Sequence, residues 1–491
     1  MKKNLTRLLA AILCLLMAMS CAAAEETTVS AIVRSYSGIL PPEDNFVLEA
    51  LEEKLGFKLD IIVCATKDEY NNRLATLKAS RKLPDIVPCT RAELAEMVEN
   101  GVVIPLDELL QEHGANLLAD KGEYMDGYTI NGQIYGISTK SAEGNQPYMM
   151  AVRKDWLDNL GMAVPTTLDE LYEVLKAFTL KDPDQNGADD TRGLCISLNS
   201  AYTYKYVIYE AFGISPRYAN LVDGQVVPDL LHPNYLEMIK YYRKLYQEGL
   251  MEPDFATKPW VQCAEDLWNG KFGAVVFSPA GPANNWMSRY SDPKPEWVFL
   301  NLYGINGVQN GFDNARLDLA DCVAISASCK DPVAAIKFLD YFVTEECQDL
   351  VLLGIEGKHF VNNPDGSASY LSPYAEDISL QRNEGGGAYV NIMGSMLHNG
   401  TMKTLNAVTR DAITLGLANP FAGAVHLFTT PEIELEMGGL LTDISTEAFA
   451  SLIVSEGDIE AEYQSYVDKY LRSGGQEWIE QATEIYNNQN K

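Results

Sequence analysis

The sequence predicts an α/β protein in two blocks, each with a mainly parallel sheet covered by helices. Short, nearly continuous apolar runs that suit buried strands alternate with segments whose apolar residues recur at helical spacing. Strands joined through helices return in the same direction, so this order favours parallel sheets with helices on both faces. The same alternation starts again near Met149, which predicts a second α/β block, and helices dominate toward the C-terminus.

The first block contains three predicted strands and two predicted helices. The first helix starts at Asp44 or Asn45, carries leucines at helical spacing and ends at Gly56, since glycine commonly ends helices. The second helix and the strands are marked by apolar residues alone. These markers are Tyr70, Leu74 and Leu77 for the helix, and Val29–Arg34, Leu59–Val63 and Leu83–Val87 for the strands.

From Met149 onward the alternation continues. Thr167 and Glu170 have the spacing of a capping box, in which a hydroxyl and a carboxylate bond the main-chain N–H groups at a helix start. Asp331 followed by Pro332 also predicts a helix start, because proline suits the first helical position. The other predicted elements are the strands Met149–Val152, Gly273–Phe277 and Asp321–Ile325 and a helix through Leu236, Ile239 and Leu245 that stops at Gly249.

The first residues have the organisation of a secretory signal peptide. Lys2, Lys3 and Arg7 precede an apolar run, Leu8–Met19, which is too short to span a bilayer. Small residues follow, and the chain becomes acidic at Glu25. No later segment approaches about 18 consecutive apolar residues, so we expect the mature protein to be soluble and exported.

Two cleavage sites remain open. Ala22-Ala23-Ala24 fits a small-x-small site that would remove residues 1–24. Ala18-Met19-Ser20-Cys21 resembles a bacterial lipobox, which would remove residues 1–20 and leave a lipidated Cys21 at the new N-terminus. A lipobox usually has leucine where this sequence has Ala18, and no Gly/Ser tether follows the cysteine.

The composition is that of a large, acidic, folded protein. The formal net charge of −30 becomes −33 when the three basic residues of the signal are removed, and 47% of the residues are hydrophobic. An acidic chain suits nucleic-acid phosphates poorly, so we expect no nucleic-acid partner. Past the signal the seven cysteines form no CxxC pair, and the five histidines are isolated. This pattern favours neither a disulfide framework nor a zinc site.

Five stretches spread over nearly the whole mature chain carry a family pattern. They are Leu83–Val87; Tyr135–Ile137 followed by Val152–Gly161; Val164–Tyr172; Tyr246–Asp254; and Asp331–Phe342 running into Gly354–Gly357. In this order they resemble the extracellular solute-binding proteins (family 1) of ABC importers. The similarity is greatest to the large branch that includes alginate-oligosaccharide receptors and related lipoproteins. One stretch alone is weak evidence, but five in register are hard to produce by chance.

The resemblance implies a two-lobed, periplasmic-binding-protein-like fold (type II) with the ligand in a cleft between the lobes. Lobe 1 would comprise 27–142 plus about 318–370, and lobe 2 about 147–314 plus 371–491. The implied function is that of a receptor that closes over a sugar or oligosaccharide and delivers it to the permease subunits of an ABC importer. We expect a monomer, with a lipid anchor if the lipobox is used. A peptide or another small organic solute is the alternative ligand.

An acidic loop follows the calcium-loop pattern D-x-[DN]-x-[DN]-G. Carboxylate, amide and main-chain oxygens at this spacing suit a hard cation. An EF-hand has a bidentate glutamate at loop position twelve, where this chain has Gly193, and some members of the resembling family have an acidic residue at the position of Thr191. The resemblance implies a structural calcium ion, and the alternative is a solvated acidic turn. The candidate ligands are Asp182, Asp184, Asn186, Ala188 (main-chain carbonyl) and Asp190.

A sugar receptor needs flat aromatic faces for the C–H surfaces of sugar rings and planar polar groups for their hydroxyls. Trp286 is the best aromatic candidate, because loops that follow parallel strands face the cleft in such folds. Trp156 and Trp268 are assigned to packing. The candidate ligand-binding residues are Tyr36, Trp260, Asn284, Asn285, Trp286, Tyr303 and Glu356.

Two other classes of function stay open. A secreted carbohydrate-active hydrolase needs two carboxylates at a set separation, and among 68 acidic residues some pair can always be imagined. The motifs G-x-S-x-G, H-E-x-x-H and G-x-x-x-x-G-K-[ST] do not occur, so we expect the protein not to be an enzyme. A sensory or adhesion module on the same fold would use the cleft for signalling instead of transport.

Overall fold

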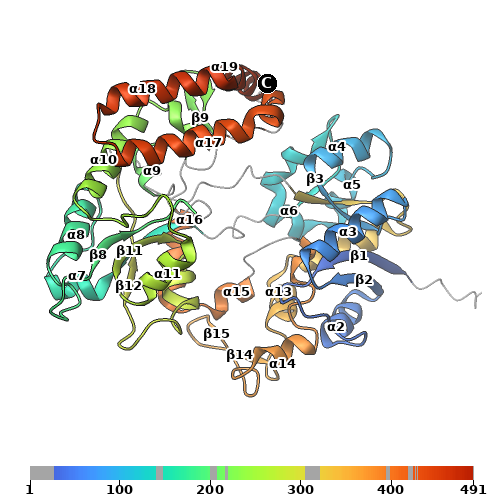
Figure 1. The fold of residues 1–491 in the computed structure, drawn as a ribbon. Coiled ribbons are helices and arrows are strands. Elements are labelled where there is room, and N and C mark those ends of the chain that lie inside the picture. The colour runs from blue at the N-terminus through green and yellow to red at the C-terminus, as the bar shows by residue number, and fades with distance from the viewer. Residues whose placement is uncertain are drawn as a thin grey trace, which may run out of the picture. The chain divides into compact units, whose positions relative to one another are not determined.

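The chain folds into two compact units (Figure 1). Unit 1 comprises Met1–Lys140, Ala320–Val361 and Ser369–Ser395, and unit 2 comprises Ser141–Leu319, Asn362–Ala368 and Met396–Lys491. The computed structural model describes residues 27–139, 147–199, 207–215, 219–304, 321–393, 399–418, 424–425, 427 and 430–489. The predicted signal peptide and Cys21 lie outside these ranges.

Unit 1 begins with alternating strands and helices and is completed by segments that come after the first stretch of unit 2. Its strands are β1 (Thr28–Arg34), β2 (Lys58–Cys64), β3 (Ile86–Thr90), β4 (Thr129–Ile130), β5 (Gln133–Ile134), β6 (Ile137–Ser138) and β13 (Asp321–Ile325). Its helices are α2 (Phe46–Leu55), α3 (Lys67–Ala79), α4 (Arg91–Glu99), α5 (Asp107–His113), α6 (Ala115–Lys121), α12 (Pro332–Phe342), α13 (Glu345–Leu352) and α14 (Ile378–Asn383).

The main strands of unit 1 form two small sheets. β1 pairs in parallel with β2, whereas β13 lies between β3 and β6 and runs antiparallel to both. Asp85, just before β3, joins the two sheets, because its Oδ2 accepts hydrogen bonds from the N–H (2.8 Å) and the hydroxyl (2.7 Å) of Ser30 on β1. The expectation of mainly parallel pairing is wrong for this unit. β13 enters from a distant part of the chain, and the helical connections that impose parallel order do not govern its direction.

The segment 371–395 belongs to unit 1 and not, as expected, to the second lobe. The side chains of Gln381 and Arg382 on α14 donate hydrogen bonds to the carbonyl of Leu352 at the end of α13, at 3.2 and 2.9 Å. Two short strands precede the segment, β14 (Phe360–Asn362) and β15 (Ala368–Tyr370). The residues that connect them belong to unit 2, so the chain leaves unit 1 and returns within a few residues.

Unit 2 contains a second α/β layer and a C-terminal group of helices. Its strands are β7 (Met149–Arg153), β8 (Arg192–Cys195), β9 (Ala219–Val222), β10 (Gln225–Val227), β11 (Phe272–Phe277), β12 (Trp297–Phe299) and β16 (Ala424–Val425). Its helices are α7 (Lys154–Leu160), α8 (Leu168–Leu180), α9 (Ile208–Ala211), α10 (Tyr235–Gln247), α11 (Trp260–Trp268), α15 (Asn399–Thr404), α16 (Ala407–Ala418), α17 (Glu432–Val454), α18 (Ile459–Tyr470) and α19 (Gln476–Gln489).

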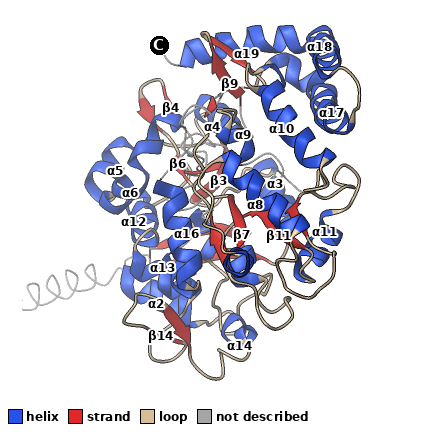
Figure 2. Cartoon of the chain, turned by 90° about the vertical axis from the view of Figure 1, so that its left-hand side faces the viewer, coloured by secondary structure: helices blue, strands red, loops and turns tan. Residues whose placement is uncertain are grey.

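The largest sheet among the described residues of unit 2 has four strands in the order β12-β7-β11-β8, of which β7 and β11 are labelled in Figure 2. β11 is parallel to β8 and antiparallel to β7, so this sheet is also mixed. Trp156 of α7 and Phe178 of α8 pack edge-on beneath it with ring centroids 5.3 Å apart, and both are fully buried. This confirms the packing role predicted for Trp156. Gly273 on β11 lets Phe178 lie against the strand, since a Cβ there would be 2.1 Å from Phe178 Cδ2.

The C-terminal helices α17, α18 and α19, coloured red in Figure 1, lie beside α10 and β10. Within the described ranges, α17 is the one helix whose length and composition would allow it to cross a membrane. Its residues Leu441, Ile444, Phe449 and Leu452 are buried in the main core of unit 2. One face of α17 is therefore covered by protein, as expected for a core helix of a globular unit.

Most predicted elements are confirmed, and the differences from the prediction lie at the ends of some of them. Asn45 caps α2 and Gly56 ends it with φ 76°, and Asp331 caps α12 in the predicted way. The third strand starts at Ile86, three residues later than predicted, because the Asp85 side chain is occupied with β1. At α8 only half of the capping box forms, since the Glu170 carboxylate accepts from Thr166 rather than from Thr167.

Candidate functional site

The loop after β11 folds into a tight turn that presents Trp286. A short π-helical turn, η3 (Gly281–Asn285), begins three residues after the end of the strand at Phe277. A Cβ on Gly281 would lie 2.5 Å from Phe277 Cδ1 and 3.1 Å from Trp286 Cζ2, so glycine is required for these rings to approach. The two ring centroids are 4.5 Å apart at an angle of 50°. The turn therefore fixes the indole against the end of the strand.

Four aromatic side chains from separate segments meet at this end of β11. Trp260, the first residue of α11, stacks on Phe277 with centroids 5.6 Å apart and an angle of 3°. Trp260 is also 6.3 Å from Trp286, and Tyr148 approaches Phe277 edge-on at 5.9 Å. All four residues are only partly buried. We call Tyr148, Trp260, Phe277 and Trp286 the aromatic cluster.

Carboxamide side chains lie next to the aromatic cluster. Asn284 is half-buried and donates to Asn285 Oδ1 at 3.2 Å, while Asn285 is exposed. Asn284 Oδ1 accepts from the N–H of Asn406 at 3.2 Å, and the Asn406 amide donates to the carbonyl of Ala283. Asn406 also caps α16 by accepting from the N–H of Thr409 at 2.9 Å. These bonds anchor the turn that carries Trp286 to the start of α16.

Three predicted ligand residues lie elsewhere. Tyr303 is in unit 2 and 45% exposed, and its N–H donates to the carbonyl of Thr166 at 2.7 Å. Tyr36 and Glu356 are exposed residues of unit 1, in the loops after β1 and after α13. Their part in ligand binding stays a prediction. The structure thus brings together Trp260, Asn284, Asn285 and Trp286 of the seven predicted residues.

Sequence reasoning missed three members of this site, Tyr148, Phe277 and Asn406. Phe277 had a readable signal, because it is the last residue of the predicted strand and immediately precedes the loop that carries Trp286. Tyr148 and Asn406 had none, since they come from segments far away in the chain and reach the site only through tertiary packing. Trp268, which was assigned to packing, is partly buried beside Trp286 at 6.1 Å.

The acidic loop after α8 is folded by its own side chains. Asp182 Oδ1 and Oδ2 accept from the N–H groups of Asn186 and Gly187, both at 3.1 Å. The Asn186 amide nitrogen donates to Asp184 at 2.9 Å and to Asp190 at 3.2 Å. The Asn186 amide group therefore lies between the carboxylates of Asp184 and Asp190 and donates a hydrogen bond to each. The side chains of Asp182, Asp184 and Asp190 are therefore linked through Asn186 and Gly187 within the loop.

Asp184 is the most informative residue of the loop. Its Oδ1 is shielded from solvent and has no hydrogen-bond partner. Burial, aided by the neighbouring Asp182 and Asp190, raises the pKa of Asp184 above its usual value. An unsatisfied, shielded carboxylate oxygen is costly unless a cation or a proton compensates it. Across the described residues, however, no three His, Cys, Asp or Glu side chains already stand close enough together to be a metal site.

The end of the loop explains the departure from an EF-hand. Thr191 is buried, and its hydroxyl donates to the carbonyl of Phe178 at 2.8 Å, which ties the loop to α8. Gly193 lies within β8, where a Cβ would be 2.6 Å from the carbonyl oxygen of Leu250 and 2.8 Å from Leu175 Cβ. Loop position twelve therefore has no room for a glutamate. Any cation here has to be held by the first nine loop positions.

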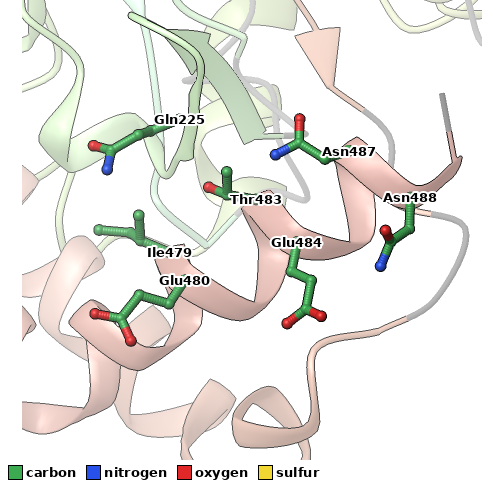
Figure 3. Close-up of a pocket in the computed structure, with 7 residues that line it drawn as sticks. All are labelled: Gln225, Ile479, Glu480, Thr483, Glu484, Asn487 and Asn488. Atoms are coloured by element: carbon green, nitrogen blue, oxygen red, sulfur yellow. The ribbon is translucent and has the colours of Figure 1, made fainter. Parts of the chain in front are cut away.

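Unit 2 also carries two surface grooves. One, of about 600 Å³, runs between β12 and α16 and borders the η3 turn through Ala283, Met287 and Asn406. The other, of about 460 Å³, is formed by successive turns of α19 and by Gln225 of β10 (Figure 3). Its acidic residues are Glu480 and Glu484.

The chain forms two α/β units, and unit 2 presents partly exposed aromatic rings beside amide side chains. These features define a two-domain binding protein for a small molecule. The family follows from comparison. The chain belongs to the bacterial extracellular solute-binding proteins, whose family model matches residues 62–349, more than half of its length. This confirms the resemblance inferred from the sequence stretches and places the protein outside the cytoplasm.

Relatives and solved structures agree with this assignment. Two relatives are from Bacillus subtilis (strain 168). Lipoprotein LipO is 26% identical over 485 residues, 95% of this chain and 93% of its own. The polygalacturonan/rhamnogalacturonan-binding protein YtcQ is 27% identical over 475 residues, 91% of this chain and 89% of its own. An HMO binding ABC-transporter associated solute-binding protein from Bifidobacterium longum infantis shares the fold, with a TM-score of 0.70, 20% identity and coverage of 94% of this chain and 99% of that one.

Proposed function

We propose that the protein is the extracytoplasmic receptor of an ABC importer and binds a sugar or an oligosaccharide. The aromatic cluster is the observation that carries this proposal. Its rings come from four segments, remain partly exposed and lie at the end of a buried strand. Sugar rings present C–H faces that stack on such surfaces, and amides such as Asn285 match their hydroxyls. The names of YtcQ and of the Bifidobacterium protein, both carbohydrate binders, support the same ligand class.

The proposal includes no bond cleavage. The residues of the site are indoles, a phenyl ring, a phenol and carboxamides, none of which activates a water molecule at neutral pH. A hydrolase would need two carboxylates on either side of a glycosidic bond. A sugar incubated with the protein should therefore be recovered unchanged on chromatography. Release of shorter sugars would favour the hydrolase alternative.

The binding test uses thermal shift against a panel of oligosaccharides, followed by calorimetry with the sugar that stabilises the protein. Trp286→Ala and Trp260→Ala should each weaken binding of that sugar by about fivefold or more, since stacking of a nucleic-acid base on one aromatic side chain is worth about 1–3 kcal/mol and a sugar face stacks in the same way. Trp478→Ala is the matched control, because Trp478 is a partly buried indole of α19 whose Nε1 donates to Glu434. Equal losses in all three variants would contradict the proposed site.

We also propose that the acidic loop binds calcium through Asp182, Asp184, Asn186, the carbonyl of Ala188 and Asp190. The shielded, unpartnered Asp184 Oδ1 supports this, because a hard cation satisfies such an oxygen. Rotation of the Asn186 side chain would replace its bridging amide nitrogen by its oxygen. A bound divalent ion would offset most of the negative charge of the ligand carboxylates and tie the end of α8 to β8.

Calcium should raise the melting temperature of the wild-type protein over the chelated protein by several degrees, since an ion at a hundred times its Kd adds about 2.7 kcal/mol. Asp184→Ala combined with Asp190→Ala should abolish this difference. Asp189→Ala is the matched control, because Asp189 lies in the same loop but outside the donor pattern. Identical melting of chelated and calcium-loaded wild type would contradict the site.

Finally, we propose that Cys21 is lipidated and anchors the protein at the cell surface, which the name of LipO supports. Wild-type protein expressed in a bacterium should remain with the membrane fraction and incorporate a labelled fatty acid. Cys21→Ser should be free of label. A mature wild-type chain that starts at Glu25 would instead show cleavage by the other route.

A further inference from the structure

Two cysteines from distant parts of the chain face each other in unit 1. Cys89 on β3 and Cys322 on β13 are direct partners in the antiparallel register, and their sulfur atoms are 3.5 Å apart. Both side chains are buried, with exposures of 5% and 0%. The site is closely packed, since a Cβ on Gly136 would lie 3.1 Å from Cys322 Sγ. The two thiols are therefore held against each other.

Cys195 and Cys263 of unit 2 are a second pair of cysteines whose thiols hydrogen-bond to each other. Both are also buried, and their sulfur atoms lie near main-chain oxygens as well. Cys195 Sγ lies 3.6 Å from the carbonyl of Cys263, and Cys263 Sγ lies 3.8 Å from the carbonyl of Ile196. Each thiol thus has a local acceptor. This pair provides an internal control with the same residue type and burial.

We propose that Cys89 and Cys322 form a cross-strand disulfide in the exported protein. Extracellular proteins encounter an oxidising environment in which adjacent thiols form stable disulfides. The Cα atoms of directly opposed antiparallel residues are about 4.5–5.5 Å apart, within the range that a disulfide spans. The sulfur atoms have to approach from 3.5 Å to about 2.0 Å, which small rotations about χ1 achieve.

The reaction is exchange with a small-molecule disulfide such as oxidised glutathione. One cysteine thiolate attacks the reagent, forms a mixed disulfide and releases one small thiol. The second cysteine thiolate then attacks the protein sulfur of that mixed disulfide and displaces the second small thiol. The two protons lost by the cysteines are taken up by the two leaving thiolates. The protein dithiol is oxidised and the reagent is reduced by the same two electrons.

The position in the ladder sets how far apart the two Cα atoms are. The N–H of Ser326 donates to the carbonyl of Asp85, so the opposed pair Asp85 and Ser326 is a hydrogen-bonded one. Alternation along the ladder makes Cys89 and Cys322 a hydrogen-bonded pair as well, in which side chains stand farther apart than in the other type. The Cα atoms of a hydrogen-bonded pair are about 5.5 Å apart, which is close to the commonest separation in disulfides, so the backbone does not oppose the bond.

The timing follows from burial. The hydrogen-bonding Cys89 thiol and burial raise the pKa of Cys322, so the Cys322 thiol keeps its proton in the folded protein and reacts slowly. Exchange takes place while the strands are assembling, before the site is covered. The bond would then join the first stretch of unit 1 to the stretch that begins at residue 320, across the whole intervening part of unit 2.

The test maps cysteines in the wild-type mature chain. Protein unfolded with reductant is refolded in a mixture of oxidised and reduced glutathione, alkylated, digested without reduction and analysed by mass spectrometry. The expected product is a peptide pair joined through Cys89 and Cys322, with the remaining cysteines alkylated. Alkylation of every cysteine, or a disulfide between other cysteines, overturns the proposal.

Variants add a second readout. The oxidised wild type should melt several degrees above the reduced protein, because the cross-link restricts the unfolded chain. Cys89→Ala combined with Cys322→Ala should melt at one temperature with or without reductant. Cys195→Ser combined with Cys263→Ser should keep both the cross-linked peptide pair and the shift. A redox-dependent shift that persists in the first variant overturns the proposal.

Discussion

His359, in the loop after α13, shows how a single side chain can make stability depend on protonation. The N–H of Ile355 donates to Nδ1 at 2.8 Å, and Nε2 lies 3.3 Å from the Glu384 carboxylate. Phe46 and Tyr374 flank the ring, with centroids 4.5 and 4.8 Å away. Because Nδ1 accepts, it carries no proton in the folded state. Burial lowers the pKa of His359, and the hydrogen bond with Glu384 opposes this only in part.

The free energy of unfolding should therefore fall as the pH drops below about 6.5, the pKa of histidine in an unfolded chain. Below that pH the imidazole of His359 binds a proton in the unfolded chain but stays neutral in the folded protein, which favours unfolding. Above that pH the imidazole is neutral in both states, and its contribution to the free energy of unfolding is fully present. Urea midpoints at pH 8 and pH 5.5 measure the effect. His359→Gln should reduce the difference. Equal pH dependence in wild type and His359→Gln would contradict this account.

Gly273 and Gly439 make a matched pair for the same substitution. A Cβ on Gly273 would lie 2.1 Å from Phe178 Cδ2 and 2.7 Å from Trp156 Cε3, both in the core. Gly439, in the exposed part of α17, has nothing within 4 Å of such an atom. Gly273→Ala should cost about 1–3 kcal/mol through overpacking, whereas Gly439→Ala should add about 0.5–1 kcal/mol through helix propensity. Denaturant unfolding measures both, and a tolerated Gly273→Ala would contradict the close packing.

At the scale of the element, the start of α8 depends on one hydroxyl. Thr167 Oγ1 accepts from the N–H of Glu170 at 3.2 Å, which satisfies a main-chain donor of the first turn. Thr167→Ala should lower the free energy of unfolding by about 1 kcal/mol. Thr166→Ala should cost only a few tenths, because it removes an exposed side-chain bond to Glu170. Equal effects of the two substitutions in urea titrations would argue against the cap.

Elements could be predicted from the sequence where the decisive signal is local. β1, β2, β7, β11 and β13 are apolar runs between breakers, and α2 and α12 have caps that can be read directly. Strand direction was not readable, because pairing such as that of β13 with β3 joins residues more than 200 positions apart. The site divides in the same way. Trp286 and its neighbouring asparagines follow a strand, whereas Tyr148 and Asn406 reach them only through the folded sheet and α16.

At the scale of the whole molecule, the predicted ligand contacts are divided between the units. Tyr36 and Glu356 belong to unit 1, and Trp286 belongs to unit 2. A solute that touches both groups stabilises arrangements in which the units are close, so its binding energy shifts the population toward a compact form. Small-angle scattering should show a smaller radius of gyration once the identified sugar is added. An unchanged radius would confine binding to one unit.

The placement of β13 between β3 and β6 has a consequence for biogenesis. A chain that crosses a membrane N-terminus first delivers β3 and β6 early, but their shared partner arrives only with residues 321–325. The four strands of the central sheet of unit 2 are all delivered by residue 299. Unit 2 can therefore complete its central sheet while β3 and β6 of unit 1 still lack β13, the strand that pairs with both. Assistance during translocation would be needed most by the half of the protein that emerges first.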